Sequence, residues 1–171
     1  MIYCLRPIGV VHVPFNDEVV KGSRNGVTGV LEIFQDFSDG LRGIDGFSHL
    51  IVVSYLHKTL EEWRTTLLVR PRKLIRLGFQ LDEVPEVGVF CTDSPHRPNP
   101  IGITIVKFVK RDGRFLYVDG LDLFDGTPII DLRPYTMDRV RTNLEFPEWY
   151  TKVLARIKGL LGGSEDVGLG V

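Results

Sequence analysis

The chain has 171 residues, a formal net charge of −1, 43% hydrophobic residues and 25% charged residues. This length corresponds to one domain, and the composition is ordinary for a soluble globular protein. A net charge this close to zero excludes a whole-molecule field that would attract nucleic acid or a membrane. Any contact with nucleic acid therefore requires a local basic surface.

Cys4 and Cys91 are isolated in the sequence. They form neither a metal-binding spacing nor a disulfide framework, which is typical of a reducing cytoplasm. The N-terminal stretch "MIYCLRPIGVVHVPF" is interrupted by Arg6 and Pro7 and lacks the layout of a signal peptide. No apolar run reaches the ~20 residues that a membrane helix needs. We expect a cytoplasmic protein that makes no membrane contact.

Short segments rich in β-branched and aromatic residues dominate the chain. Turn residues separate them, and strands are predicted at 8–13, 28–34, 47–57, 86–92, 101–110, 115–124 and 127–135. The segment 47–57 is nearly continuous in apolar residues, which predicts a strand buried on both faces. Asp112-Gly113 predicts a two-residue hairpin loop. This series indicates an all-β barrel or sandwich.

Only the end of the chain has a clear helical pattern. Pro147 and Gly162-Gly163 are typical start and stop signals, and between them apolar residues recur at helical spacing: Trp149, Val153, Leu154, Ile157, Leu160 and Leu161. A short second helix is predicted within "LEEWRTTLL" (60–68). The predicted fold is mainly β: a single β-barrel domain with a C-terminal α-helix over residues 1–163, followed by a flexible tail at 164–171.

The stretch "SPHRPNPIGIT" (94–104) holds three prolines among polar side chains. Each proline fixes its own φ and extends the residue before it. The resulting stiff connector would hold Ser94, His96, Arg97 and Asn99 in place, as a binding site requires. A proline-rich corner between two strands would explain the same pattern.

Three aspartates, Asp122, Asp125 and Asp131, lie in otherwise apolar surroundings. A carboxylate in such a setting is costly unless it is paired or hydrogen-bonded, so these residues either cap turns or serve a site. Asp125 precedes Gly126 and is typical of a turn. Asp131 is expected to pair with an arginine such as Arg133 or Arg97.

Two further groups are candidates. His49 and His57 are eight residues apart, a spacing that puts both on one face of a strand, either as core residues or as ligands. A run of basic residues without an intervening acid would hold a phosphate backbone or form a solvated face: Arg64, Arg70, Arg72, Lys73 and Arg76. Nucleotide-binding glycine motifs and zinc spacings are absent, so neither a Rossmann-type site nor a metal site is expected.

Three stretches together carry a family resemblance: "GVFCTDSPHRPNPIGIT", "GLDLFDGTPIIDLRPY" and "GLRGIDGFSHLIVVSYLHK". In register from "IGVVHVPF" to Tyr135, they resemble the TsaA/TrmO-like family, also known as YaeB-like proteins. The resemblance implies a β-barrel tRNA methyltransferase that uses S-adenosylmethionine. It implies methylation at N6 of a threonylcarbamoyl-adenosine beside the anticodon, and a homodimer with the cofactor site near its interface.

The resemblance also implies cofactor contacts. The histidine and polar residue that end the "FSH" strand fall on His57 and Lys58, and the residue after the "RPNPIG" core is Ile103. The "LDLxDG" segment supplies Asp122, Leu123, Phe124 and Asp125. Carboxylates and an aromatic face can hold the sulfonium cation, and Asp122 or Asp125 could bind ribose hydroxyls or the amino group.

The chain departs from the family pattern at two places. Asp93 occupies an expected cofactor-binding position at which members usually carry an arginine, so Arg97 or Lys58 would have to hold the cofactor carboxylate in its place. The usual "PRQ" is missing, and Ser23, Arg24 and Asn25 of "KGSRNG" are the candidate replacements.

In the implied mechanism, Arg97 and Asn99 orient the substrate, Asp125 or Asp131 assists proton loss, and the basic run holds the RNA. The alternative from another class is a non-catalytic barrel that binds S-adenosylmethionine or RNA as a sensor or adaptor. A metal-dependent hydrolase that uses His49, His57 and His96 is disfavoured because these residues lack ligand spacing.

Overall fold

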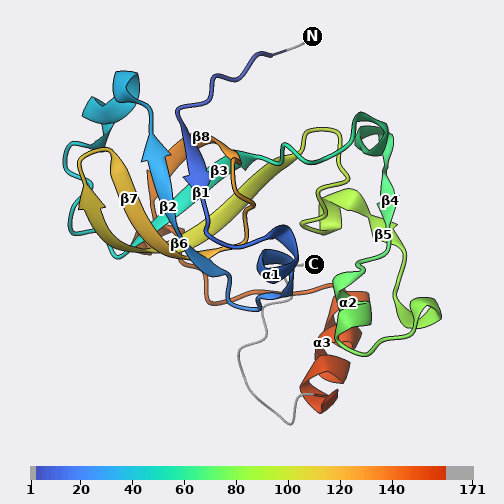
Figure 1. Ribbon diagram of the computed structural model, residues 1–171. Coiled ribbons are helices and arrows are strands. Elements are labelled where there is room, and N and C mark those ends of the chain that lie inside the picture. The colour runs from blue at the N-terminus through green and yellow to red at the C-terminus, as the bar shows by residue number, and fades with distance from the viewer. Residues whose placement is uncertain (1–2, 161–171) are drawn as a thin grey trace. The chain divides into compact units, whose positions relative to one another are not determined.

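The computed structural model describes residues 3–160, which divide into two compact units (Figure 1). The first unit comprises residues 3–58 and 100–140, and the second comprises 59–99 and 141–160. The tail predicted at 164–171 lies outside the described residues. The boundaries of a single domain over residues 1–163 stay a prediction.

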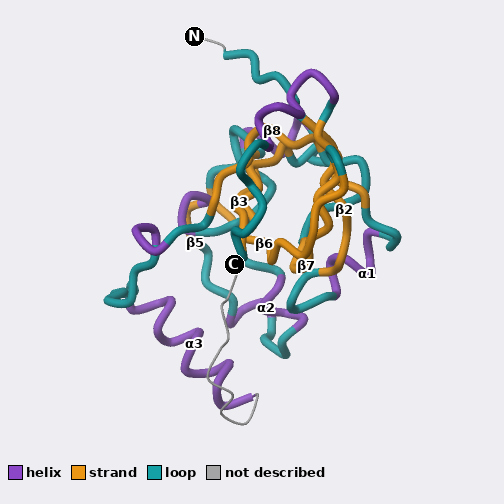
Figure 2. The backbone as a smooth tube through the Cα atoms, turned by 90° about the vertical axis from the view of Figure 1, so that its left-hand side faces the viewer, coloured by secondary structure: helices purple, strands orange, loops and turns teal. Residues whose placement is uncertain are grey.

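The first unit is a closed barrel in which every pair of neighbouring strands is antiparallel. Within the described residues its strands run in the order β1-β2-β7-β6-β3-β8 and surround the core (orange in Figure 2). Their bounds are β1 (Gly9–His12), β2 (Val27–Ile33), β3 (His49–Tyr55), β6 (Ile101–Asp112), β7 (Phe115–Leu121) and β8 (Pro128–Pro134). The prediction of a β-barrel is confirmed.

Alternating side chains along the strands fill the inside of this barrel. In β3, Leu50, Val52 and Ser54 are buried, while the residues between them remain partly exposed. The prediction that this strand is buried on both faces is therefore wrong, because only every second side chain points inward. The fully buried apolar residues of the barrel core are Val11, Leu31, Val52, Val106, Leu116, Leu121 and Ile129.

The predicted hairpin is present one residue later than expected. Strand β6 continues to Asp112, which pairs with Phe115, so Gly113 and Arg114 form the loop. Strand β7 ends at Leu121, before the Asp122–Phe124 segment that the prediction had included in it.

A short helix that the sequence analysis did not predict, α1 (Asp17–Gly22), lies between β1 and β2. The Asn16 side chain accepts a hydrogen bond from the Val19 N–H, and Asp17 and Glu18 occupy the first turn. These are ordinary N-terminal signals, but the helix is too short to show an apolar period. The other connections of this unit contain two 3₁₀ helices, η1 (Gln35–Leu41) and η5 (Met137–Arg139).

The second unit packs two helices and short extended pieces around its own core. Its elements are η2 (Glu61–Thr65), β4 (Leu68–Val69), α2 (Lys73–Arg76), η3 (Leu81–Glu83), β5 (Val87–Gly88), η4 (Val89–Cys91) and α3 (Glu148–Leu160). The buried apolar residues are Leu74, Phe79, Val84, Val153 and Ile157. The C-terminal helix is confirmed. The strand predicted at 86–92 is wrong beyond Val87–Gly88, and the helix predicted at 60–68 is only the 3₁₀ turn η2.

Gly102 of β6 lies opposite Ser54 of β3, and the two strands leave no room for a side chain at residue 102. A Cβ there would lie 2.6 Å from Ser54 Oγ and 2.8 Å from Leu56 Cδ2. The glycine of "RPNPIG" is thus required by a close approach inside the barrel rather than by its φ angle.

We predict that Gly102→Ala lowers the free energy of unfolding by about 1–3 kcal/mol, because the added methyl group overpacks this contact. Urea unfolding measures the change. Gly40→Ala is the matched control: it lies in η1, nothing is within 4 Å of its Cβ position, and its effect should stay within about 0.5 kcal/mol. Equal effects of the two substitutions would contradict the assignment.

Candidate functional site

Most of the predicted cofactor residues lie at one end of the barrel. The register pairs Tyr55 with Ile101 and Val27 with Leu121, so the connections after β1, β3 and β7 leave from the same end. These connections carry the predicted cofactor residues Ser23, Arg24, Asn25, His57, Lys58, Asp122, Leu123, Phe124 and Asp125. Segments far apart in the sequence are thus brought to one place by the antiparallel pairing.

Lys58 links two of these connections. Its Nζ lies 2.7 Å from both carboxylate oxygens of Asp17 in α1 and 5.0 Å from the centre of the Phe124 ring. Lys21, which pairs with Glu18 at 2.7 Å, places its own Nζ 5.5 Å from that centre. The Phe124 ring therefore already interacts with cations, as the negative face of an aromatic ring does.

Asp122 and Asp125 are each fixed through one oxygen. The Thr104 hydroxyl donates to Asp122 Oδ1 at 2.6 Å, and the Val13 N–H donates to Asp125 Oδ1 at 3.0 Å. Both aspartates are exposed. The turn predicted at Asp125-Gly126 is confirmed. The two carboxylates are oriented by the protein and still open to solvent.

His57 lies beyond the end of β3, so the prediction that it shares a strand face with His49 is wrong. Partial burial, followed by the nearby Lys58 ammonium, lowers the pKa of His57 below its ordinary value of 6.5, against the opposing charges of Asp17 and Asp125. The imidazole is therefore neutral at pH 7.

The loop with Ser23, Arg24 and Asn25 lies against β7. Ser23 donates a hydrogen bond to the Gly26 carbonyl at 2.5 Å. Gly26 has a φ of 74°, and a Cβ on it would lie 2.4 Å from the Gly120 carbonyl carbon. Only glycine permits such a close approach of the Gly26 and Gly120 backbones. The loop therefore lies beside the end of β7, directly before Asp122.

The remaining barrel candidates, Ile103 and Asp131, lie on the outer face of the barrel. They line an apolar groove of about 480 Å³ together with Leu5, Ile51, Val53, Ile101, Ile130, Arg133 and Arg139. Arg133 Nε donates to Asp131 Oδ2 at 2.9 Å, and the Leu132 N–H donates to Oδ1. The predicted arginine partner of Asp131 is thus Arg133. Ile103 is 71% exposed.

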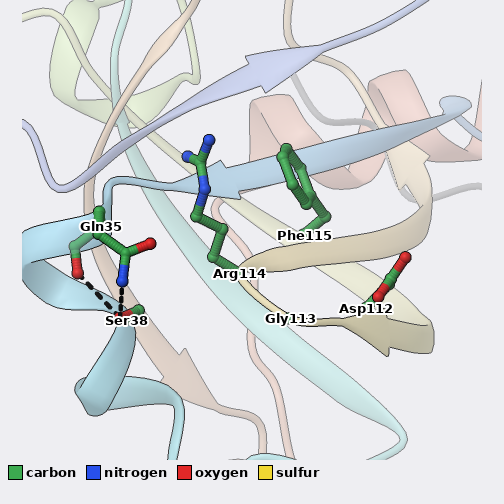
Figure 3. Close-up of a pocket in the computed structure, with 6 residues that line it drawn as sticks. All are labelled: Gln35, Ser38, Asp112, Gly113, Arg114 and Phe115. Atoms are coloured by element: carbon green, nitrogen blue, oxygen red, sulfur yellow. Dashed lines mark hydrogen bonds between the residues drawn. The ribbon is translucent and has the colours of Figure 1, made fainter.

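A second pocket of about 400 Å³ lies at the turn between β6 and β7 and contains no predicted site residue (Figure 3). It is lined by Gln35, Ser38, Asp112, Gly113, Arg114 and Phe115. Nearby, Glu32 accepts hydrogen bonds from Arg114 and from His12, whose Nε2 lies 2.7 Å from Oε2. These bonds, the one to His12 first, lower the pKa of Glu32.

In the second unit, the connector predicted to be stiff is held by hydrogen bonds. The Arg97 guanidinium donates to the Thr92 carbonyl at 2.8 Å and to the Val89 carbonyl at 3.1 Å. Ser94 Oγ accepts from the His96 N–H at 3.3 Å. Arg97 thus builds its own loop, while Asp93 and Asn99 are exposed.

The predicted RNA-binding residues divide into two groups. Arg64 Nε donates to the Pro98 carbonyl at 3.1 Å, and Arg70 Nη1 donates to the Val84 carbonyl at 2.7 Å. Both arginines therefore help to hold the second unit together. Arg72, Lys73 and Arg76 lie exposed in and beside α2.

Sequence reasoning missed Asp17, Lys21 and Thr104, and although it singled out His96 it did not predict that this ring stacks on Trp63. Asn16 before two acidic residues is the one local signal that could have indicated α1. Among residues 3–160 no three histidine, cysteine or acidic side chains are grouped so that they could hold a metal ion. None of the helices in this range is long and apolar enough to cross a membrane.

Comparison with known proteins identifies the relatives of this chain. Residues 12–139 match the family model for the tRNA-methyltransferase O N-terminal domain. A probable S-adenosyl-L-methionine-binding protein of Pyrococcus abyssi is 34% identical over 163 residues, which cover 92% of this chain and 82% of that protein.

Longer relatives are matched only in part. A tRNA (adenine(37)-N6)-methyltransferase of Escherichia coli is 36% identical over 139 residues, which cover 75% of this chain and 55% of that enzyme. A crystal structure of TrmO is similar with a TM-score of 0.61 and 28% identity, covering 86% of this chain and 66% of that one. Family model, relatives and fold agree: the chain belongs to the tRNA-methyltransferase O (TrmO) family, with the family's N-terminal domain over residues 12–139.

Proposed function

We propose that the protein is an S-adenosylmethionine-dependent methyltransferase that modifies N6 of threonylcarbamoyl-adenosine next to the anticodon of tRNA. Its relatives include an enzyme named for methylation at N6 of adenine 37 in tRNA and proteins named for binding S-adenosylmethionine. The observation that carries the proposal is the cluster at the barrel end, where the Phe124 ring interacts with cations beside two oriented carboxylates.

The side chains of this cluster fit the cofactor. The Phe124 ring suits a sulfonium, since ammonium groups already lie within 5.5 Å of its centre. Asp122 and Asp125 each use one oxygen within the protein, which leaves the other for ribose hydroxyls or for the ammonium of the methionine portion. When bound, the cofactor supplies the methyl group.

Lys58 is the better of the two candidates to hold the cofactor carboxylate in place of the family's arginine, for which this chain has Asp93. Arg97 is already bonded to two main-chain carbonyls, whereas the Lys58 ammonium, which pairs with Asp17, lies at the Phe124 ring on a flexible stem that can reach a second anion. In this assignment Ile103, Leu123, Ser23, Arg24 and Asn25 are further cofactor contacts.

Asp125 is the better candidate to accept the proton that leaves N6. Both oxygens of Asp131 already accept hydrogen bonds, from Leu132 and Arg133. Asp125 keeps one oxygen open to solvent, and a carbamoyl-substituted N6 is more acidic than a simple amine. In this proposal Arg97 and Asn99 orient the substrate. The basic residues between Arg64 and Arg76 contact the RNA.

A second copy of the chain and tRNA are the partners that we propose, with the protein acting in the cytoplasm. The outer groove supports self-association, because Ile103, Ile105 and Leu5 expose 71%, 49% and 58% of their surface there or beside it. The second candidate function is a non-catalytic protein that binds S-adenosylmethionine, which the names of several archaeal relatives favour.

We predict that the purified protein binds S-adenosylmethionine and that Asp122→Asn raises the Kd about 10–100-fold, the effect of losing a charge-assisted hydrogen bond. Isothermal titration measures both. Asp39→Asn removes the same charge from the exposed surface of η1 and should leave the Kd unchanged. Lys58→Met should weaken S-adenosylmethionine but not methylthioadenosine, which lacks the carboxylate. No binding at millimolar cofactor would overturn the proposal.

We predict transfer of a labelled methyl group to tRNA that carries threonylcarbamoyl-adenosine. Asp125→Asn should lower kcat by about 10²–10⁴, the usual contribution of a general base, while its Oδ1 can still accept the Val13 N–H bond. A loss confined to cofactor affinity would make Asp125 a binding residue instead. Cofactor binding without transfer to any tRNA would establish the non-catalytic alternative.

We predict that cofactor affinity falls on acidification. His57 is neutral at pH 7 because its pKa is lowered, and on acidification below that lowered pKa it takes up a proton and adds a positive charge near the proposed sulfonium site. The Kd should therefore rise ~3–10-fold between pH 7.5 and pH 5. In His57→Gln this part of the rise should disappear. The same pH profile in wild type and His57→Gln would exclude a role for His57.

A further inference from the structure

Two aromatic rings stack in the second unit without a role in the site described above. The Trp63 ring lies on η2 and the His96 ring lies in the connector 93–99, with 4.1 Å between ring centres and 28° between ring planes. Both residues are partly exposed. Since neither ring is fully covered, this is a stack at the surface of the unit rather than part of its core.

Hydrogen bonds fix both sides of the stack. Arg64, which follows Trp63, donates through Nε to the Pro98 carbonyl, two residues beyond His96. The His96 N–H donates to Ser94 Oγ, and Arg97 donates to the Thr92 carbonyl at 2.8 Å. The rings are thus held in place before any ligand arrives, which reduces the entropy lost on binding.

The charges around the stack suit a nucleotide. Partial burial, followed by the positive charge of Arg72, lowers the pKa of His96, so its ring is neutral at pH 7. Arg72 is exposed, and no carboxylate pairs with it within residues 3–160. A neutral aromatic surface beside an available guanidinium combines the two contacts that single-stranded RNA makes: base stacking and a phosphate ion pair.

We propose that Trp63 and His96 form a platform on which a nucleobase of single-stranded RNA stacks, and that Arg72 contacts the adjoining phosphate. This inference rests on the proposed function, because it assigns the recognition of an unpaired tRNA loop to the second unit. If the stacked rings of Trp63 and His96 served only to hold the connector 93–99 in place, they would not require Arg72 beside them without a carboxylate partner.

The experiment uses the fluorescence of Trp63. The chain has two tryptophans, so Trp149→Phe leaves Trp63 as the sole reporter, and this variant must first bind RNA like wild type. The probe is single-stranded oligo(A) RNA of eight nucleotides. Stacking should quench the fluorescence saturably, whereas an abasic oligonucleotide of the same length, which offers only phosphates, should not quench it.

Substitutions then separate stacking from charge. Trp63→Ala and His96→Ala should each raise the Kd for oligo(A) about 5–150-fold, the equivalent of about 1–3 kcal/mol per stacked base, and Trp63→Phe should restore most of the affinity. Arg72→Gln should lower the slope of log Kd against log salt by about one. Leu67→Ala, 59% exposed in the same unit, is the control and should bind like wild type.

The outcomes distinguish this inference from the proposed function. Oligo(A) binding by folded Trp63→Ala or His96→Ala at wild-type affinity would overturn the platform, as would equal quenching by the abasic probe. Loss of S-adenosylmethionine binding in the same variants would show a structural role and would also overturn it. If the platform variants lose RNA while the wild-type protein transfers no methyl group, the platform stands and the proposed enzyme activity falls.

Discussion

The barrel depends on the close approach of β3 and β6 at Gly102. These strands pair from His49 opposite Lys107 to Tyr55 opposite Ile101, although the whole stretch 59–99 is inserted between them. The Leu56 N–H donates to the Pro100 carbonyl at 2.8 Å and closes the base of the insertion. The strand pairing already holds the two ends of the insertion close together, so closing this loop costs little additional entropy. The register of β3 and β6 is therefore kept despite the insertion.

The residues of the "RPNPIG" stretch have different structural roles. Gly102 provides space against Ser54, Pro100 closes the base of the insertion, and Arg97 holds two carbonyls of its own loop. These three residues therefore maintain the strand pairing and the conformation of the loop. The groups suited to chemistry lie instead on the connection after β7, where Asp122 and Asp125 are oriented by a hydroxyl and an amide and remain open to solvent.

Short segments rich in β-branched and aromatic residues, separated by turn residues, were sufficient to predict an all-β barrel or sandwich, and in the structure strands such as β3 and β6 bury alternate side chains. This pattern failed at Val89–Cys91, where apolar residues form a 3₁₀ turn and no local pattern distinguishes them from a strand. The family resemblance indicated Lys58 and Phe124, but their partners could not be predicted. The Lys58–Asp17 pair spans 41 residues, and such contacts are determined by strand pairing rather than by sequence spacing.

The ion pairs at the barrel end bear on the proposed sulfonium site, because both ammonium groups near the Phe124 ring also have carboxylate partners. Lys58 contacts both the Phe124 ring and the Asp17 carboxylate, and Lys21 contacts both the ring and Glu18. Each ammonium thus keeps an anionic partner if it leaves the ring, so the ring can accept a sulfonium without leaving a charge unpaired. A bound cofactor carboxylate would give Lys58 a further partner, so that its binding exchanges ion pairs rather than breaking them.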